Sequence, residues 1–201
     1  MPEIVTSLPL LALTAVLGYL LGSIPFGIVM ARAFGLGDLR KIGSGNIGAT
    51  NVLRTGNKLA AFLTLVLDAG KGGIAVLLAR WALAEDAAQL AGVAAFLGHL
   101  FPVWLGFKGG KGMATFLGTL LALSFPVGLA ACGLWLITAA VTRISSLSAL
   151  VVAVLSPVAA WVLGRPDLLM LSVLLALIIL ERHKANIGRL LAGTEPRIGK
   201  K

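Results

Sequence analysis

The stretch Met113-Ala-Thr-Phe-Leu-Gly-Thr-Leu-Leu-Ala-Leu-Ser-Phe-Pro-Val-Gly-Leu-Ala-Ala-Cys-Gly-Leu-Trp-Leu-Ile-Thr-Ala-Ala-Val-Thr142 decides how the chain is arranged. As one membrane crossing it gives the chain six spans, and as two crossings that turn near Ser124-Phe125-Pro126 it gives seven. At about 1.5 Å per residue, a helix over residues 113–123 covers about half of a hydrocarbon core roughly 30 Å thick. Short helices at membrane depth usually border a site or cavity.

The composition of the whole chain is that of a membrane protein. Of the 201 residues 58% are hydrophobic, and the mean hydropathy is +0.99. Apolar runs of about 20 residues match the length of a bilayer-spanning helix, whereas a membrane barrel would show short alternating segments. Glu3 is the only charged side chain before Arg32, so the first apolar segment is predicted to span the membrane and not to be a cleaved signal. The single cysteine, Cys132, excludes an intramolecular disulfide.

The distribution of charge orients these spans. Residues 32–58 carry five cations and one anion, and residues 181–201 carry six cations and two anions. Seven spans put both segments in the cytoplasm, as the positive-inside rule requires, whereas six would separate them. The net charge of +9 then indicates anionic lipid or substrate and not nucleic acid. We predict an all-α integral membrane protein with seven transmembrane helices, one of them short, the N-terminus outside and the C-terminus cytoplasmic. Residues 1–201 form a single polytopic domain with spans at about 4–31, 59–81, 87–107, 113–123, 127–142, 147–163 and 168–180.

Two glycine-rich stretches lie among the polar segments: Gly43-Ser-Gly-Asn-Ile-Gly-Ala-Thr-Asn-Val-Leu-Arg54 and Gly106-Phe-Lys-Gly-Gly-Lys-Gly-Met-Ala-Thr115. Glycine reaches positive φ and lets a ligand approach the main chain, so backbone N–H groups can turn toward an anion. Neither stretch is a nucleotide P-loop, because Lys111 is followed by Gly112 and no strand precedes it. Solvated turns beside lipid headgroups are the simpler alternative.

The polar side chains on the predicted cytoplasmic side are donors and cations with almost no carboxylates. Such a set suits a phosphate-bearing ligand and suits a metal poorly. The hydroxyl of Ser148 has a second interpretation, a bond to a backbone carbonyl one turn earlier. The candidates are Ser44, Asn46, Thr50, Arg54, Lys111, Thr115, Ser145, Ser146, Ser148, His183 and Asn186.

Asp68, Lys71 and His99 are ionisable residues deep inside apolar segments. Asp68 and Lys71 are three residues apart, and charges at this depth are usually paired. They form either an ion pair that fixes helix packing or a brace beneath the glycine-rich stretches. His99 is predicted to pack between helices, whereas His183, where the last span leaves the bilayer, is placed to contact substrate or shuttle a proton.

The sequence contains no standard acyltransfer nucleophile. There is no Gly-x-Ser-x-Gly elbow, and Cys132 lies in an apolar run. Acyltransferases that use thioesters often carry His-x-x-x-x-Asp, but Trp104 and Gly188 stand five residues after the two histidines. A thioester-dependent enzyme of that kind is therefore not predicted.

Six motifs occur in order over nearly the whole chain: Gly22-Ser-Ile-Pro25, the stretch 43–54, Asp68-x-x-Lys71-Gly72, Gly98-His99-x-Phe101-Pro102, Phe107-Lys-Gly-Gly-Lys-Gly112 and Arg182-His183-x-x-Asn186-Ile-x-Arg189-Leu190. Together they resemble the bacterial acyl-phosphate:glycerol-3-phosphate acyltransferases, the PlsY family. The resemblance implies a multi-pass enzyme of the bacterial inner (plasma) membrane with its active site on the cytoplasmic face. Such an enzyme transfers a fatty acyl group from acyl phosphate to the 1-hydroxyl of sn-glycerol 3-phosphate, giving lysophosphatidic acid and phosphate, in the first acylation of bacterial phospholipid synthesis.

The resemblance implies no cofactor and no metal, and its partners are acyl phosphate, glycerol 3-phosphate, membrane lipid and the upstream soluble enzyme that makes acyl phosphate. We expect Ser44, Asn46, Thr50, Gly109, Gly110, Lys111 and Gly112 to hold the acyl phosphate headgroup. The resemblance places glycerol 3-phosphate near Ser44, Arg54, Lys111, Ser148, His183 and Asn186. Lys111, Arg54, Ser44 and His183 are the expected catalytic residues, and either His183 or the leaving phosphate takes the hydroxyl proton.

Two other classes of protein fit part of the pattern. Broken helices and an intramembrane Asp–Lys pair also suit a transporter or translocase for a phosphorylated solute or lipid. Against this, the polar residues gather at one membrane face and not at the midplane of two repeats. A non-catalytic scaffold would leave Arg54 and Lys111 unexplained.

Overall fold

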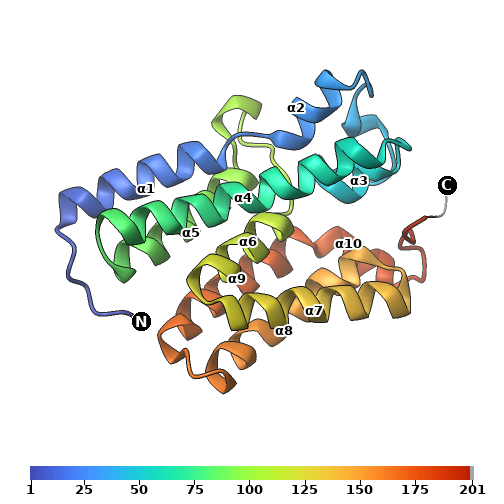
Figure 1. The fold of residues 1–201 in the computed structure, drawn as a ribbon. Coiled ribbons are helices and arrows are strands. Elements are labelled where there is room, and N and C mark those ends of the chain that lie inside the picture. The colour runs from blue at the N-terminus through green and yellow to red at the C-terminus, as the bar shows by residue number, and fades with distance from the viewer. Residues whose placement is uncertain (200–201) are drawn as a thin grey trace. The chain divides into compact units, whose positions relative to one another are not determined.

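The computed structural model describes residues 1–199, whose regular structure is helical throughout (Figure 1). Its helices group into two compact units. The N-terminal unit is Glu3–Leu123, and the C-terminal unit begins at Ser124 and includes Met1–Pro2.

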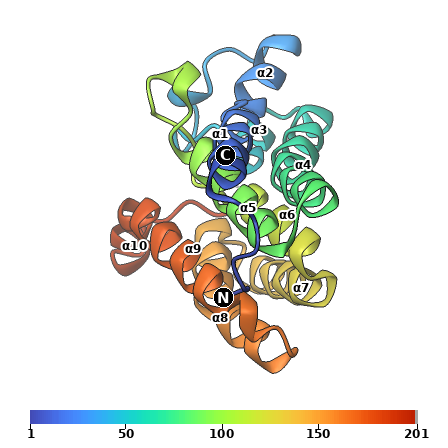
Figure 2. The ribbon, with the colours of Figure 1, turned by 90° about the vertical axis from the view of Figure 1, so that its left-hand side faces the viewer.

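The N-terminal unit contains six α-helices and two short 3₁₀ turns. They are α1 (Leu8–Gly22), α2 (Phe26–Ala33), η1 (Leu39–Lys41), α3 (Ala49–Leu53), α4 (Lys58–Ala82), α5 (Glu85–Leu100), η2 (Val103–Leu105) and α6 (Met113–Leu123). Figure 2 shows α1, α4 and α5 close together, in agreement with their mutual contacts. Asn57 starts α4, because its side chain accepts a hydrogen bond of 2.9 Å from the Ala60 N–H.

Small residues let the long helices of this unit touch backbone to backbone. A Cβ atom on Gly22 would overlap the main chain of Ala95, and one on Gly118 would overlap that of Ala69. The first contact joins α1 to α5, and the second joins α6 to α4. Because lipid tails are as apolar as leucine, close packing of this kind is what holds helices together inside a bilayer.

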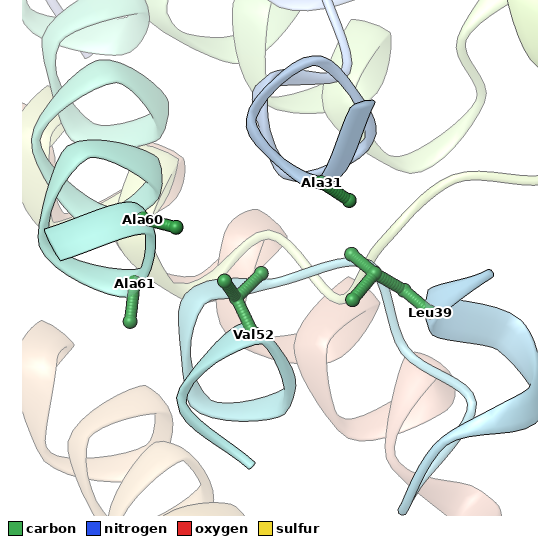
Figure 3. Packing of buried hydrophobic residues seen from close by; sticks show 5 residues of the cluster. All are labelled: Ala31, Leu39, Val52, Ala60 and Ala61. Atoms are coloured by element: carbon green, nitrogen blue, oxygen red, sulfur yellow. The ribbon is translucent and has the colours of Figure 1, made fainter. Parts of the chain in front are cut away.

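A small apolar core lies where α2, η1, α3 and α4 meet. Figure 3 shows its members, which are Ala31, Leu39, Val52, Ala60 and Ala61. Leu39 and Val52 flank the stretch 43–48 and are both fully buried. This core therefore fixes both ends of the first glycine-rich segment.

The C-terminal unit contains α7 (Phe125–Thr142), α8 (Ser145–Val162), η3 (Pro166–Leu168), α9 (Leu169–Arg182) and α10 (Lys184–Leu191). The predicted break before α7 is confirmed: α6 ends at Leu123, and Ser124 has an extended backbone with φ −152° and ψ 108°. Arg143 ends α7 in the left-handed conformation at φ 59°. The chain after α10 returns to this turn, where the Ile198 N–H donates to the Arg143 carbonyl over 2.6 Å.

Among residues 1–199, five helical segments are long and apolar enough to cross a membrane. They are Leu8–Ala33, Lys58–Ala82, Glu85–Leu105, Phe125–Thr142 and Ser145–Val162. The first begins four residues later than the predicted 4–31, and it is bent where Ser23, Ile24 and Pro25 interrupt the helix between α1 and α2. The other two predicted spans correspond to α6, with 11 residues, and α9, with 14.

Candidate functional site

The first glycine loop, residues 43–48, is held by the side chain of Asn51 on α3. The Asn51 amide donates to the carbonyls of Leu39 over 2.9 Å and Asn46 over 2.7 Å. Its oxygen accepts from the Ser44 N–H at 3.1 Å. Asn51 is 1% exposed, so these bonds replace solvent inside the unit. One buried amide thus fixes two points of the loop and the η1 turn that precedes it.

The same amide oxygen also brings Arg54 to the loop. Nη1 of Arg54 lies 3.3 Å from Oδ1 of Asn51, and its side chain packs against Gly43. Gly43 and Gly45 have φ of 52° and 67°, where a Cβ would be strained. Ser44 is exposed. The structure therefore places the predicted residues Ser44 and Arg54 at the same side-chain oxygen of Asn51.

The other two predicted residues of this segment lie close by in sequence and structure. Asn46 and Thr50 are half-buried, Asn46 in the loop and Thr50 on α3. The Asn46 carbonyl is used by Asn51, and the side-chain amide of Asn46 lies beside Gly48. Both residues keep part of their side chains accessible.

The second glycine loop, residues 106–112, is held by its own main chain. The Gly109 N–H donates to the Leu100 carbonyl over 3.0 Å, and the Gly110 N–H donates to the His99 carbonyl over 3.1 Å. These two amides satisfy carbonyls at the end of α5. The expectation that loop amides turn toward an anion is therefore not met at Gly109 and Gly110.

Lys111 and Gly112 stand directly before α6. Gly112 has φ 83° and is buried against the ring of Phe96, whereas Lys111 is half-buried. The first turn of an α-helix has N–H groups with no partner inside the helix, and the helix dipole favours an anion there. This start of α6 brings a cation and helix amides together, which is a typical anion site.

A hydrogen bond joins the two glycine loops. Nη2 of Arg40, just before the first loop, donates to the carbonyl of Lys108 in the second over 2.7 Å.

Thr115, another candidate, is fully buried, and its hydroxyl donates to the Asp68 carbonyl over 2.8 Å. Thr115 therefore fastens α6 to α4.

Asp68 and Lys71 form the predicted ion pair, with 2.9 Å between Oδ1 and Nζ. Each is 2% exposed. Nδ1 of His99 lies 3.5 Å from the same Asp68 oxygen, and His99 is 5% exposed. The burial of His99 agrees with the prediction that it packs between helices. Asp68 of the ion pair therefore contacts His99, whose carbonyl accepts from the Gly110 N–H of the second glycine loop.

In the C-terminal unit, Glu195 binds two of the remaining candidates, Ser146 and Asn186. The Glu195 carboxylate accepts from Ser146 over 2.6 Å, from the amide of Asn186, and from Nε of Arg189 over 2.7 Å. Burial raises the pKa of Glu195, and these three donors outweigh it, so the pKa lies below its ordinary value. The ionised carboxylate thereby ties α8 to α10 and orients Asn186.

Ser148 and His183 are both turned to backbone carbonyls. The Ser148 hydroxyl donates to the Ile144 carbonyl over 3.0 Å, which is the backbone bond that the sequence allowed. Nδ1 of His183 lies 2.8 Å from the Ile179 carbonyl. Because a carbonyl only accepts, Nδ1 carries the proton, and the lone pair of a neutral ring is on Nε2. His183 is 3% exposed at the junction of α9 and α10, and half-buried Ser145 begins α8.

Three residues that organise these clusters were not among the predicted site residues: Arg40, Asn51 and Glu195. Asn51 could have been found, because a side chain with two donors and one acceptor inside a glycine-rich stretch is suited to fix a loop. Glu195 gave a weaker signal as one of two acids in a basic tail. Within residues 1–199 no group of three or more His, Cys, Asp or Glu side chains is placed to hold a metal ion.

Comparisons with known proteins agree with the predicted resemblance. The family model described as glycerol-3-phosphate acyltransferase matches residues 12–193. A glycerol-3-phosphate acyltransferase of Jannaschia sp. is 72% identical over 199 residues, covering 99% of this chain and 98% of the relative. One of Cereibacter sphaeroides is 67% identical over 201 residues, covering 100% of this chain and 96% of the relative.

Two solved structures are similar to the fold. Both are crystal structures of PlsY (YgiH), an integral membrane glycerol 3-phosphate acyltransferase. Its glycerol 3-phosphate form has a TM-score of 0.88 and 40% identity, covering 94% of this chain and 96% of that one. Its lysophosphatidic acid form has a TM-score of 0.85 and 37% identity, covering 94% and 95%.

Proposed function

The chain belongs to the glycerol-3-phosphate acyltransferase family, and on this premise we propose that it uses acyl phosphate as the acyl donor. The reaction transfers the fatty acyl group to the 1-hydroxyl of sn-glycerol 3-phosphate and gives lysophosphatidic acid and phosphate. The single observation that carries the proposal is the family match over residues 12–193. The cationic, donor-rich loops support it, because both substrates are phosphate esters or anhydrides.

Acyl phosphate is a mixed anhydride and is already activated. The 1-hydroxyl oxygen attacks the carbonyl carbon, a new C–O ester bond forms, and the bond between that carbon and the phosphate oxygen breaks. The hydroxyl proton goes to the leaving phosphate or to His183, and the bonding electrons leave with the phosphate. The enzyme therefore has to hold two anions together and stabilise developing negative charge, which requires neither a nucleophilic side chain nor a metal.

The acyl phosphate headgroup is assigned to the two glycine loops. Lys111 and the first turn of α6 supply the positive charge and amides, and Gly109, Gly110 and Gly112 set the path of the main chain that presents Lys111. Ser44, Asn46 and Thr50 supply the facing polar groups. The hydrogen bond between Arg40 and Lys108, which links the two loops, supports this assignment.

Glycerol 3-phosphate is assigned to Arg54 and Lys111, with Ser44, Ser148, His183 and Asn186 completing the set. Arg54 suits bidentate binding of phosphate, and Lys111 suits a shared charge between the two substrates. The Nδ1–H of His183 faces Ile179, so a proton taken by His183 would go to Nε2.

In the membrane we propose a single polytopic domain with seven spans, in which α6 and α9 are the two short ones. The N-terminus lies outside, and the C-terminus and the active site lie on the cytoplasmic side of the bacterial inner membrane. The positive charge of residues 32–58 and 181–201 supports this orientation. The acyl chain enters from the bilayer, and an upstream soluble enzyme supplies the acyl phosphate.

Phosphate release by the purified protein in detergent tests the function. Palmitoyl phosphate is supplied with and without glycerol 3-phosphate, and the lipid product is identified by mass. We expect phosphate release that depends on glycerol 3-phosphate, with lysophosphatidic acid formed. A folded, lipid-supplemented sample that forms no such product refutes the proposal and leads instead to flux assays in vesicles, which test the transporter alternative.

A further inference from the structure

The buried cluster of Asp68, Lys71 and His99 lies directly behind the second glycine loop and takes no part in the chemistry described above. Its three side chains come from α4 and α5, and all three are 5% exposed or less. Charged groups at membrane depth are expensive to keep, so their retention calls for a specific use. The ion pair alone would fix only one turn of α4.

The imidazole of His99 stands against Gly110. A Cβ atom on Gly110 would overlap Nε2 of His99, and the Gly110 N–H donates to the His99 carbonyl over 3.1 Å. The next residue, Lys111, starts the turn that leads into α6. The position of the His99 ring therefore sets the path of the main chain that presents Lys111.

Asp68 and Lys71 hold the ring from the other side. Oδ1 of Asp68 lies 2.9 Å from Nζ of Lys71 and 3.5 Å from Nδ1 of His99. Nζ of Lys71 also donates to the Ile24 carbonyl over 2.8 Å, at the interruption between α1 and α2. The cluster is thus anchored to the link between α1 and α2, through a carbonyl that also accepts from the Phe26 N–H over 3.1 Å.

The opposite end of the cluster reaches the first glycine loop through α2. This helix starts just after Ile24, and a Cβ on Gly27 in its first turn would overlap the carbonyl oxygen of Ile47. The Asp68 carbonyl also receives the Thr115 hydroxyl from α6 over 2.8 Å. Both glycine loops and the start of α6 are therefore packed on elements that this cluster joins.

From this geometry we propose that His99, fixed by Asp68 and Lys71, is the positioning residue for the second glycine loop and sets the affinity of that loop for the acyl phosphate headgroup. The inference rests on the proposed function. It assigns to His99 no contact with substrate: the ring acts through the main chain of Gly110. Misplacement of binding groups by about 1 Å can lower a rate by about 100-fold, so a shift of this loop is measurable.

A double-mutant cycle at His99 and Gly110 tests the proposal. Gly110→Ala puts a methyl group against Nε2 and should raise the KM for palmitoyl phosphate at least tenfold. His99→Asn shortens the side chain and opens the space that the methyl needs. The double variant should therefore bind palmitoyl phosphate as well as His99→Asn alone or better, a strongly non-additive result. The KM for glycerol 3-phosphate should stay within threefold in His99→Asn.

The ion pair is tested by removing both charges together. Replacing a buried pair by neutral side chains often leaves stability unchanged, whereas removing one partner strands a buried charge. The variant Asp68→Asn with Lys71→Met should unfold near the wild-type temperature. Its KM for palmitoyl phosphate should nevertheless be raised, as is expected of His99→Asn. A purely structural ion pair would instead leave that KM unchanged.

Asp86→Asn is the matched control. Asp86 is a buried carboxylate at the opposite end of α5, where it accepts from the N–H groups of Val5 and Thr6 over 3.0 and 2.8 Å. Its loss should lower the unfolding temperature and leave the KM for palmitoyl phosphate unchanged. Additive effects in the cycle, or an unchanged KM in His99→Asn, overturn the inference. Failure of wild-type protein to make lysophosphatidic acid refutes the proposed function instead, so the two failures are distinct.

Discussion

The substitution Asn51→Asp tests whether one amide holds the first glycine loop. It keeps the size of the side chain and replaces the Nδ2 donor by an oxygen. That oxygen then faces the Leu39 and Asn46 carbonyls, which the amide now contacts at 2.9 and 2.7 Å. Two hydrogen bonds are lost and two acceptors are set against a carboxylate oxygen.

The magnitude follows from the number of groups left without a partner. The Leu39 carbonyl keeps the Ile42 N–H at 3.3 Å, so the Asn46 carbonyl is the one that loses its partner, and one unsatisfied buried acceptor costs about 1–3 kcal/mol. At about 1.4 kcal/mol per factor of ten, this cost lowers the equilibrium constant for ordering the loop about 5-fold at its lower limit and about 100-fold at its upper limit. We therefore expect kcat/KM for palmitoyl phosphate to fall by about 5-fold or more.

The assay is steady-state phosphate release in detergent, with Asn57→Asp as the control. Asn57 starts α4, and its side-chain oxygen accepts from the Ala60 N–H over 2.9 Å. Aspartate caps a helix as well as asparagine does and suits the helix dipole, so this change should be neutral. The reasoning is refuted if Asn51→Asp keeps kcat/KM within threefold of wild type, or if both variants lose activity equally.

Three further predictions use the same protein in detergent. Lys111→Ala should lose most of its turnover and still fold. Lys108→Ala removes an exposed side chain of the same loop and should keep its turnover. Equal activity of the two variants in phosphate release would contradict the assignment of Lys111. The pKa of Glu195 lies below its ordinary value, so the stabilisation by the ionised carboxylate is present above that ordinary value and is lost as the pH falls through the lower folded value. Thermal unfolding should show this acid loss in wild type and not in Glu195→Gln, and equal acid sensitivity would argue against it. Gly118→Ala should destabilise the folded protein by about 1–3 kcal/mol, because its Cβ meets the Ala69 main chain. Gly133→Ala, where a Cβ on α7 meets open space, should leave the stability unchanged. The unfolding temperatures of the two variants test this difference.

The fold could be predicted from the sequence where local chemistry decides it. The sequence predicts the turn near Ser124-Phe125-Pro126, because only two crossings of residues 113–142 put the basic segments 32–58 and 181–201 on one side. Proline in the first turn then suits the start of α7. The contacts between helices could not be predicted, because Gly22 and Gly118 pack against particular backbone atoms that no local pattern identifies.

In the candidate site, too, local sequence predicts some features and tertiary packing determines the others. Residue types indicated a phosphate site, since Arg54 and Lys111 stand among glycines and hydroxyls. The partners of Asn186 could not be predicted, because Glu195 reaches it through the turn after α10 and also binds Ser146 on α8. Sequence gives the chemical character of a residue, whereas its partner depends on a chain return that tertiary packing determines.

The two glycine loops are built differently, and this decides which groups can face a ligand. In the first loop a side chain, Asn51, binds the main chain, so its glycines serve to reach positive φ. In the second loop the main chain of Gly109 and Gly110 completes the end of α5, so these glycines are needed because any Cβ would overlap that helix end. The amides of Gly109 and Gly110 are then already engaged. Recognition of an anion by the second loop must therefore begin at Lys111 and continue into the first turn of α6, and for this reason the position of Lys111 matters more than the number of glycines before it.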